Sequence, residues 1–249
     1  MQITPPSPTE KPVSQVWRPD LTCLPRLSWT RRLFRRFIKA VCRLLVFTCT
    51  HCQVRGLENY PTEGAALVVI NHLADADSVV SLAVLPDFPE VIGKIELRAI
   101  APLRWVTDGL GIIWVHRGQP DRRALSAALE ALAQKRRVII APEGRESLTG
   151  ALEYGTDGAA FLARKSGVKI VPVALTGTEH VYDSLKRLRR AHITLTVGEP
   201  FVLARQDRGP GALAAGTRQI METLARLLPA AYRGEYACVG EAEATDSFQ

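Results

Sequence analysis

The residues of this chain that could do chemistry are concentrated in "VVINHLADADSVV", residues 68–80, which places one histidine and two aspartates between two apolar runs. His72 and Asp77 are five positions apart, so on one continuous helix they would lie about 140° apart and could not meet. A turn between them, with Asp77 near the start of the next helix, would bring the carboxylate to one imidazole nitrogen. A neutral histidine held in this way can take a proton with its other nitrogen.

The same segment also has a purely structural interpretation. Asp75 or Asp77 can be the N-cap of a helix, and His72 can be a hydrogen-bonded residue at a strand end. For an isolated pair at this spacing, the structural interpretation is the more frequent one. Under the catalytic interpretation, Asp77 orients His72, while Asp75 caps or solvates the turn.

Polar residues also follow three other segments that have the pattern of strands. Because the carboxyl ends of parallel strands meet at one edge of an open sheet, where ligands bind, we expect these residues to line one cleft. Guanidinium groups bind phosphate oxygens bidentately, so the two arginines among them indicate an anionic substrate, with structural ion pairs as an equally weighted alternative. The residues are His116, Arg117, Pro142, Glu143, Gly144, Arg145, Thr176 and Gly177, with Pro172 inside the last strand.

A protein nucleophile is not evident in the sequence. It has no Gly-x-Ser-x-Gly motif, which argues against the α/β-hydrolase arrangement. A histidine–aspartate pair without such a nucleophile predicts that a hydroxyl of the substrate is activated. A metal-dependent hydrolase built from His72, Asp75 and Asp77 would need a further histidine cluster, so we expect no metal and no cofactor.

The elements that must position these residues alternate from about residue 56 onward. Short β-branched runs at 66–70, 111–115, 137–141, 169–175 and 192–197 predict strands. Helical periodicity predicts helices over 121–134, 157–167 and 212–229. This alternation predicts an α/β fold, a single domain at residues 56–232 with a largely parallel central sheet flanked by helices.

A basic amphipathic helix is predicted ahead of this domain, at residues 29–47, "WTRRLFRRFIKAVCRLLVF". On a helical wheel its basic and apolar residues separate onto two sides, which predicts a helix that lies in a membrane interface. The alternative is a helix packed on the protein's own core with a solvated basic face. We assign 27–55 to this membrane-associating segment, and 1–26 and 233–249 to flexible tails. One side of the wheel carries Arg32, Arg36, Lys39 and Arg43, and the other carries Trp29, Leu33, Phe37, Val41 and Leu44.

Composition limits the kinds of partner and the compartment that we expect for this protein. The 249 residues carry a net charge of +7, which suggests an anionic partner, but we recognise no nucleic-acid-binding motif and expect no nucleic acid. Five widely spread cysteines favour a reducing compartment. No apolar stretch approaches about 18 residues, so no membrane-spanning helix is expected. We therefore expect a peripheral or monotopic protein at the cytoplasmic face of a membrane.

Four blocks of the sequence resemble the phospholipid/glycerol acyltransferase family, of the 1-acylglycerol-3-phosphate acyltransferase type. "NHLADAD" is similar to its Asn-His-x-x-x-x-Asp signature. "GIIWVHR", "APEGRESLTGAL" and "VKIVPVAL" resemble its second, third and fourth blocks in the same order. Together the blocks cover residues 67–177 with plausible spacing, which makes the resemblance far more specific than the signature alone.

The resemblance implies acyl transfer from an acyl thioester, on coenzyme A or acyl carrier protein, to a hydroxyl of a lysophospholipid. The leading acceptor is 1-acylglycerol-3-phosphate. His72 would be the general base and Asp77 its orienting partner, and backbone N–H groups near the strand ends could stabilise the oxyanion. The residues implied to bind substrate are Asn71, Arg117, Glu143, Gly144 and Arg145 at the acceptor, with the arginines on its phosphate, and Pro172 on the fatty-acyl side.

The chain departs from the family pattern in its third block. The family has Pro-Glu-Gly-Thr-Arg there, whereas here Arg145 follows Gly144 directly and Glu146 takes the usual arginine place. A different acceptor, glycerol 3-phosphate or another lysolipid, is therefore an alternative. A non-catalytic lipid- or acyl-thioester-binding protein is another. His116 stands where an acidic residue is common, and we interpret it as a wall of the site rather than a second base.

Overall fold

A seven-stranded sheet crosses the protein in the order β1-β7-β6-β2-β5-β3-β4. The structure is a computed structural model that describes residues 12–118, 120–203 and 211–239. All neighbouring strands are parallel except β6 and β7, so the predicted α/β fold with a largely parallel sheet is confirmed. The strands are β1 Thr50–Arg55, β2 Ala66–Ile70, β3 Glu90–Lys94, β4 Ile113–Val115, β5 Arg137–Ile140, β6 Lys169–Thr176 and β7 Ala191–Val197.

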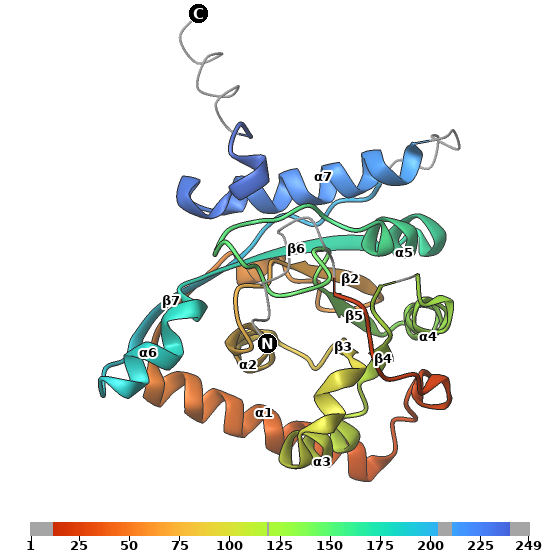
Figure 1. Ribbon diagram of the computed structural model, residues 1–249, viewed down its shortest axis with the longest axis horizontal. Helices are drawn as coiled ribbons and strands as arrows, with labels where there is room; N and C mark the ends of the chain where they lie inside the picture. Colours follow the sequence, from red (N-terminus) through yellow and green to blue (C-terminus); the bar gives the residue numbers. More distant parts are fainter. Residues whose placement is uncertain (1–11, 119, 204–210, 240–249) are drawn as a thin grey trace, which may run out of the picture.

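Helices cover both faces of the sheet (Figure 1). On one face lie α1 (Trp29–Cys49) and α2 (Ala76–Val84), with α3 (Ala101–Leu110) and α6 (Val181–Lys186) near the two ends of α1. The opposite side is covered by α4 (Arg122–Ala133), α5 (Gly158–Ser166) and α7 (Ala212–Leu227). The predicted helices at 29–47, 121–134, 157–167 and 212–229 are therefore all present, with small shifts of their ends.

Strand β2, which leads into His72, is buried on both faces. Leu67 and Val69 pack in the cluster that includes α4, α5 and α7, whereas Val68 and Ile70 pack in the one that includes α1 and α2. Side chains alternate across a strand, so a strand at the centre of a covered sheet must be apolar throughout. Full burial of each such side chain contributes about 1.5–3 kcal/mol, which fixes the end of β2 as a rigid platform.

The sheet includes two strands that the sequence did not predict, β1 and β3. Because β1 pairs with β7 from Thr50 onward, the sheet begins six residues before the predicted start of the domain. Parts of the two segments assigned to flexible tails also contact the domain. Thr22 is buried, and the N–H of Glu235 donates to the carbonyl of Leu152 at 3.1 Å. Residues 1–11 and 240–249 lie outside the described chain.

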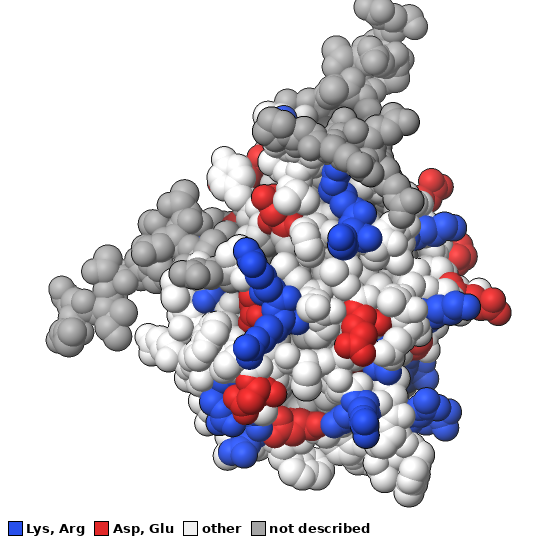
Figure 2. All heavy atoms as spheres, turned by 90° about the vertical axis from the view of Figure 1, so that its right-hand side faces the viewer, with Lys and Arg blue, Asp and Glu red and all other residues white. Residues whose placement is uncertain are grey.

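Basic and acidic side chains are interspersed on the face that lies at the right-hand side of Figure 1, as Figure 2 shows. The net charge of +7 is therefore not gathered into one basic patch on this face. A surface of mixed sign does not offer the continuous basic stripe expected for a nucleic-acid backbone.

Helix α1 turns its apolar side away from the protein. Trp29, Leu33, Phe37, Leu44 and Phe47 are 75%, 58%, 59%, 61% and 76% exposed. These apolar side chains are therefore not packed on the core, whereas Arg32, Arg36 and Arg43 of the basic side are exposed, as that alternative expects.

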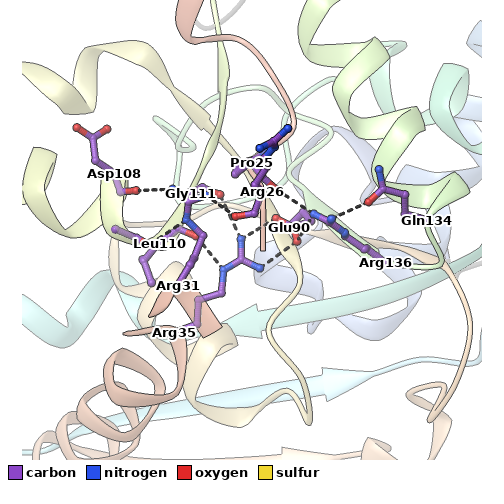
Figure 3. A network of polar contacts seen from close by, with 11 residues as sticks. Pro25, Arg26, Arg31, Arg35, Glu90, Asp108, Leu110, Gly111, Gln134 and Arg136 are labelled. Carbon is purple, nitrogen blue, oxygen red and sulfur yellow. Dashed lines mark hydrogen bonds and ion pairs between the residues drawn. The ribbon is translucent and has the colours of Figure 1, made fainter. Parts of the chain in front are cut away.

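The side of α1 that faces the protein carries cations at four-residue intervals. Arg35 is 5% exposed and donates to both carboxylate oxygens of Glu90, at 2.9 and 2.7 Å, and to the carbonyl of Leu110 (Figure 3). Arg136 approaches the same carboxylate at 3.5 Å. This buried network joins α1 to the start of β3 and to the end of α3.

Three other cations of the same side bind the ends of neighbouring helices. Arg31 donates to the carbonyl of Gly109 near the end of α3. Arg43 donates to the carbonyl of Ala83 in the last turn of α2, and Lys39 to those of Leu85 and Asp87 just beyond that helix. The last carbonyls of a helix lack partners within the helix and attract positive charge, so these cations serve as C-terminal caps.

Candidate active site

His72 and Asp77 form a hydrogen-bonded pair at the carboxyl end of β2. Asp77 is the second residue of α2 and is fully buried, and its Oδ2 lies 2.8 Å from Nδ1 of His72. The same oxygen accepts the N–H groups of Leu73 and Ala74, at 2.6 and 2.9 Å. The turn therefore brings the two side chains together as predicted, while Asp75 occupies the N-cap position with its side chain in solvent.

This arrangement fixes which nitrogen of His72 is available. A carboxylate at Nδ1 favours the tautomer that carries its proton there, so Nε2 is left as a proton acceptor. The side chain of His72 is 22% exposed, so an incoming hydroxyl can reach it. Burial of the ring opposes its charged form, but the hydrogen bond and charge of Asp77, with the charges of Glu146 and Glu143, raise its pKa above the usual value.

The loop that follows β5 holds the backbone of His72 on both sides. Glu143 is 1% exposed, and one of its oxygens accepts the N–H of His72 at 3.0 Å while the other accepts the N–H of Glu153 at 2.8 Å. The N–H of Ser147 donates to the carbonyl of His72 at 2.7 Å. Gly144 adopts φ +74° in the turn of this loop, a conformation that disfavours any side chain. The loop therefore holds His72 in position through its main chain.

Burial is the main cause of an unusual titration in this loop. It raises the pKa of Glu143 to about 7, because the ionised carboxylate is costly away from water, although two N–H donors partly offset the effect. The charges of Glu143 and His72 act on one another, since the carboxylate raises the pKa of His72 and the imidazolium lowers the pKa of Glu143.

Arg145 forms a buried ion pair inside the same loop. Its Nε and Nη2 lie 2.8 and 2.6 Å from Oε2 of Glu153, and both side chains are 5% exposed. The other oxygen of Glu153 accepts the N–H of Leu148. The guanidinium of Arg145 is bound to a carboxylate here, as the ion-pair alternative expects, and its phosphate contact stays a prediction.

Arg117 also lies against a carboxylate, but its ion pair is longer and more exposed than that of Arg145. Its Nη2 lies 3.6 Å from Oε1 of Glu96, and its buried Nε has no hydrogen-bond partner among the described residues. Its main chain is held by Ser14, which contacts both the N–H and the carbonyl of Arg117. Strand β4 lies three positions from β2, about 14 Å at the usual strand spacing, so Arg117 is farther along this edge from His72 than Lys94, which ends β3.

Two residues predicted to bind substrate are buried in the sheet. Asn71 is 1% exposed, and its amide makes two hydrogen bonds to the main chain of Leu175 in β6, at 2.9 and 2.7 Å. Pro172 lies in the middle of β6, and its carbonyl accepts the N–H of Gly198. Their geometry fits support of the strands, and a direct contact with acceptor or acyl chain is not supported by it.

His116 repeats the geometry of His72 with a different outcome. Its Nδ1 lies 2.8 Å from Oδ2 of Asp121, again five positions along the chain, but it is only 4% exposed. Its Nε2 accepts the N–H of Arg18 at 2.9 Å, and the ring of Trp17 packs on it. Both nitrogens are therefore in use, which agrees with the interpretation of His116 as a wall of the site rather than a base.

Lys94 is a site residue that sequence reasoning missed. It ends β3 at the same edge of the sheet as His72, and its Nζ lies 3.2 Å from Oε1 of Glu146. The run "EVIGK" that forms β3 contains a glycine and charges at both ends, so it did not have the pattern of a strand. The pattern that could predict it is a short apolar run that ends in a polar residue, here a lysine, as at the ends of the other predicted strands.

The described part of the chain lacks two kinds of feature. Within residues 12–118, 120–203 and 211–239, no three or more His, Cys, Asp or Glu side chains are grouped so that they could hold a metal ion. In the same ranges, the helices are too short or too polar for any of them to cross a membrane.

The structure thus presents an α/β sheet with a histidine–aspartate pair at the carboxyl end of a central strand. The family model described as Acyltransferase matches residues 51–176, and this chain belongs to that family. The resemblance seen in the four sequence blocks is thereby confirmed.

Individual relatives carry more specific names. The chain is 30% identical over 183 residues to a chloroplastic 1-acyl-sn-glycerol-3-phosphate acyltransferase of Arabidopsis thaliana, an alignment that covers 71% of this chain and 51% of that protein. It is 27% identical over 132 residues to the 1-acyl-sn-glycerol-3-phosphate acyltransferase of Borreliella burgdorferi, with 52% of each chain covered. This chain thus spans about half the length of the curated relatives that it matches.

A solved structure shares the fold. The crystal structure of the 1-acyl-sn-glycerophosphate acyltransferase PlsC of Thermotoga maritima superposes with a TM-score of 0.59 over 80% of this chain and 82% of that chain. The sequence identity is 24%, so this likeness supports the fold alone.

Proposed function

We propose that this protein transfers a fatty acyl group from an acyl thioester to a hydroxyl of a lysophospholipid, with 1-acylglycerol-3-phosphate as the leading acceptor. The observation that carries this proposal is the His72–Asp77 pair, which leaves Nε2 of a partly exposed histidine available as a base. The family membership and the names of the relatives support the same reaction.

The proposed reaction needs no covalent intermediate with the protein. Nε2 of His72 takes the proton of the acceptor hydroxyl while the oxygen attacks the thioester carbonyl carbon. The tetrahedral intermediate collapses, the carbon–sulfur bond breaks, and the leaving thiolate takes the proton from the imidazolium. The products are an ester and a free thiol, on coenzyme A or acyl carrier protein. Asp77 stabilises the imidazolium between the two proton transfers.

The acceptor phosphate is assigned to Lys94 and Arg117. Both cations lie at the sheet edge that carries His72, and their ion pairs are longer and more exposed than that of Arg145 with Glu153. Glu143 and Gly144 then contribute by shaping the loop that holds His72, rather than by touching the acceptor. Glycerol 3-phosphate and other lysolipids are alternative acceptors because they present a phosphate to the same two cations.

We propose further that α1, α3 and α6 rest on a phospholipid membrane. These elements carry an unusual share of the exposed large apolar side chains, and single-sided apolar surfaces of this kind mark interaction sites. Arg32, Arg36 and residues 186–190 add exposed positive charge beside them. This location corresponds to peripheral or monotopic association with the cytoplasmic face. The apolar side chains are Trp29, Leu33, Phe37, Leu44, Leu45, Phe47, Ile100, Trp105, Tyr182, Leu185 and Leu188.

The test is thiol release from long-chain acyl-CoA, and separately from acyl carrier protein, with a panel of lysophospholipids and glycerol 3-phosphate. Wild type should release thiol only when an acceptor is present, and His72→Ala should reduce the rate by about 10²–10⁴-fold. His180→Ala, at a histidine whose side chain is 71% exposed, is the matched control and should retain the wild-type rate.

Two results would count against this proposal. Turnover retained by a folded His72→Ala protein would remove the base assignment. Silence of the wild type with both donors and every acceptor would favour a non-catalytic protein that binds lipid or acyl thioester.

A further inference from the structure

The cations at the ends of β3 and β4 and in the loop after β5 each lie against a carboxylate. Arg145 pairs with Glu153, Arg117 with Glu96, and Lys94 with Glu146, at 2.6, 3.6 and 3.2 Å. The side chains of the first two pairs are between 5% and 28% exposed, whereas Lys94 and Glu146 are each 33% exposed. The pair open to a ligand therefore offers one positive and one negative charge, rather than an excess of positive charge.

The Lys94–Glu146 pair lies beside the proposed base. Glu146 directly precedes Ser147, whose N–H donates to the carbonyl of His72 at 2.7 Å. In the sheet, β5 alone separates β3, which ends at Lys94, from β2, which leads into His72. The charge of Glu146 also acts on the imidazole of His72. A head group attached near the reacting hydroxyl would therefore meet both charges.

The two kinds of acceptor head group interact differently with this pair. A phosphomonoester carries about −1.5 to −2 at neutral pH, so binding it at Lys94 must break the ion pair and bring two negative groups together. A phosphodiester that ends in a primary ammonium carries one charge of each sign. Its phosphate can approach Lys94 while its ammonium donates N–H groups to Glu146, so the exchange keeps both charges matched.

We propose that Glu146 selects the acceptor head group, and that the acceptors of this protein include lysophospholipids whose phosphodiester head group ends in a primary ammonium. This inference rests on the proposed acyl transfer and leaves its chemistry unchanged. The acceptor hydroxyl forms the new ester bond, the thioester carbon–sulfur bond breaks, and the proton passes through His72 to the thiolate.

The test compares two acceptors with the same acyl chain, 1-acylglycerol-3-phosphate and 1-acylglycerophosphoethanolamine, in neutral detergent micelles at saturating acyl-CoA. Wild type should turn over both. Glu146→Gln should lower kcat/KM for the ethanolamine lysolipid and raise it for the phosphomonoester, each by about fivefold, mainly through KM, because a partly exposed ion pair contributes up to about 1 kcal/mol.

Two variants separate the head-group effect from a general loss of structure. Glu146→Asp keeps the charge and should retain the wild-type preference between the acceptors. Glu130→Gln removes a carboxylate from an exposed position on α4 and should change neither kcat/KM. An unchanged ratio of the two kcat/KM values in Glu146→Gln would overturn the selection by Glu146. Turnover of the phosphomonoester without any turnover of the ethanolamine lysolipid would overturn the acceptor class.

Binding tests the head-group selection even if the acyl transfer itself fails. The dissociation constants of short-chain forms of both lysolipids are measured by calorimetry for wild type and Glu146→Gln without acyl donor. A ratio of the two dissociation constants that shifts in favour of the phosphomonoester in Glu146→Gln supports head-group selection by Glu146. An unchanged ratio overturns it. Wild type that binds both lysolipids but releases no thiol overturns the proposed function alone.

Discussion

His72 and His116 hold their carboxylate partners in the same way, with Nδ1 to Oδ2 distances of 2.8 Å to Asp77 and Asp121. They differ at the other nitrogen, because Nε2 of His116 accepts the N–H of Arg18. The sequence contains the same five-residue spacing twice, and the packing of the N-terminal segment on His116 distinguishes the two copies. A spacing rule alone therefore cannot distinguish a candidate base from a buried structural histidine.

Asp77→Asn should impair catalysis more than folding. In the wild type, Oδ2 of Asp77 accepts hydrogen bonds from His72, Leu73 and Ala74. An amide oxygen in its place carries no negative charge, so the imidazolium loses its stabilising partner. We expect a fall in kcat of about 10³-fold with a native circular dichroism spectrum. A kcat within tenfold of wild type would contradict the orienting role of Asp77.

The pH dependence of kcat/KM should show a limb above the ordinary pKa of histidine, which is about 6.5. The pKa of His72 is raised because the hydrogen bond and charges around it outweigh the effect of burial, and the base is active only when neutral. Activity should therefore fall as the pH decreases through this limb. In Asp77→Asn the residual activity should show the limb at lower pH, and a limb that does not move would exclude His72 as the titrating group.

Stability should decrease from pH 5 to pH 8, and Glu143→Gln should flatten this decrease. A carboxyl with a pKa raised from 4.5 to about 7 contributes stability that is fully present below pH 4.5 and is lost as the pH rises through 7. The raised pKa of His72 acts with the same sign. Glu143 should contribute on the order of 2 kcal/mol to the loss, measured by urea unfolding at several pH values. A wild-type profile without this slope would contradict the shifted titration.

Substitution of Arg145 should lower stability, whereas substitution of Arg117 should weaken binding of the acceptor. Arg145→Met leaves Glu153 buried without its main cation and should lower the free energy of unfolding by about 3–5 kcal/mol. Arg117→Met should leave unfolding nearly unchanged and raise the KM for a phosphate-bearing acceptor about tenfold. Denaturant unfolding and steady-state kinetics are measured on both variants. A stability loss in Arg117→Met together with a raised KM in Arg145→Met would reverse the assignment of phosphate binding to Arg117.

Vesicle binding should depend on the apolar side of α1 more than on salt. Phe37→Asp places a charge among exposed apolar side chains and should weaken binding to phospholipid vesicles by about tenfold or more. Lys39 and Arg43 of the basic side donate to main-chain carbonyls of the protein, so fewer cations remain for lipid than the helical wheel suggested. Raising the salt concentration should therefore have a smaller effect than Phe37→Asp. Leu213→Asp, at an exposed position of α7, is the control and should bind as wild type does.

Sequence patterns predicted the parts of the fold that burial determines. β2 and β6 are apolar because helices cover both faces of the sheet, and their ends marked the site edge. Strand β1, "THCQVR", was missed because an edge strand with mostly exposed side chains has no comparable pattern. The partners of Asn71 and Arg145 were also beyond reach. Leu175 and Glu153 contact them only because of the fold, and no local periodicity marks such a pairing.

The attachment of α1 through Arg35 and Glu90 has a kinetic consequence. A helix fastened to the sheet by a buried network cannot act as a flexible tether, so a protein resting on lipid through α1 has a single orientation and a fixed height above the bilayer. Acceptor molecules then reach His72 by lateral diffusion within the plane of the membrane. The rate should follow the mole fraction of lysolipid in that plane, and diluting it with inert lipid at constant total amount should slow the reaction.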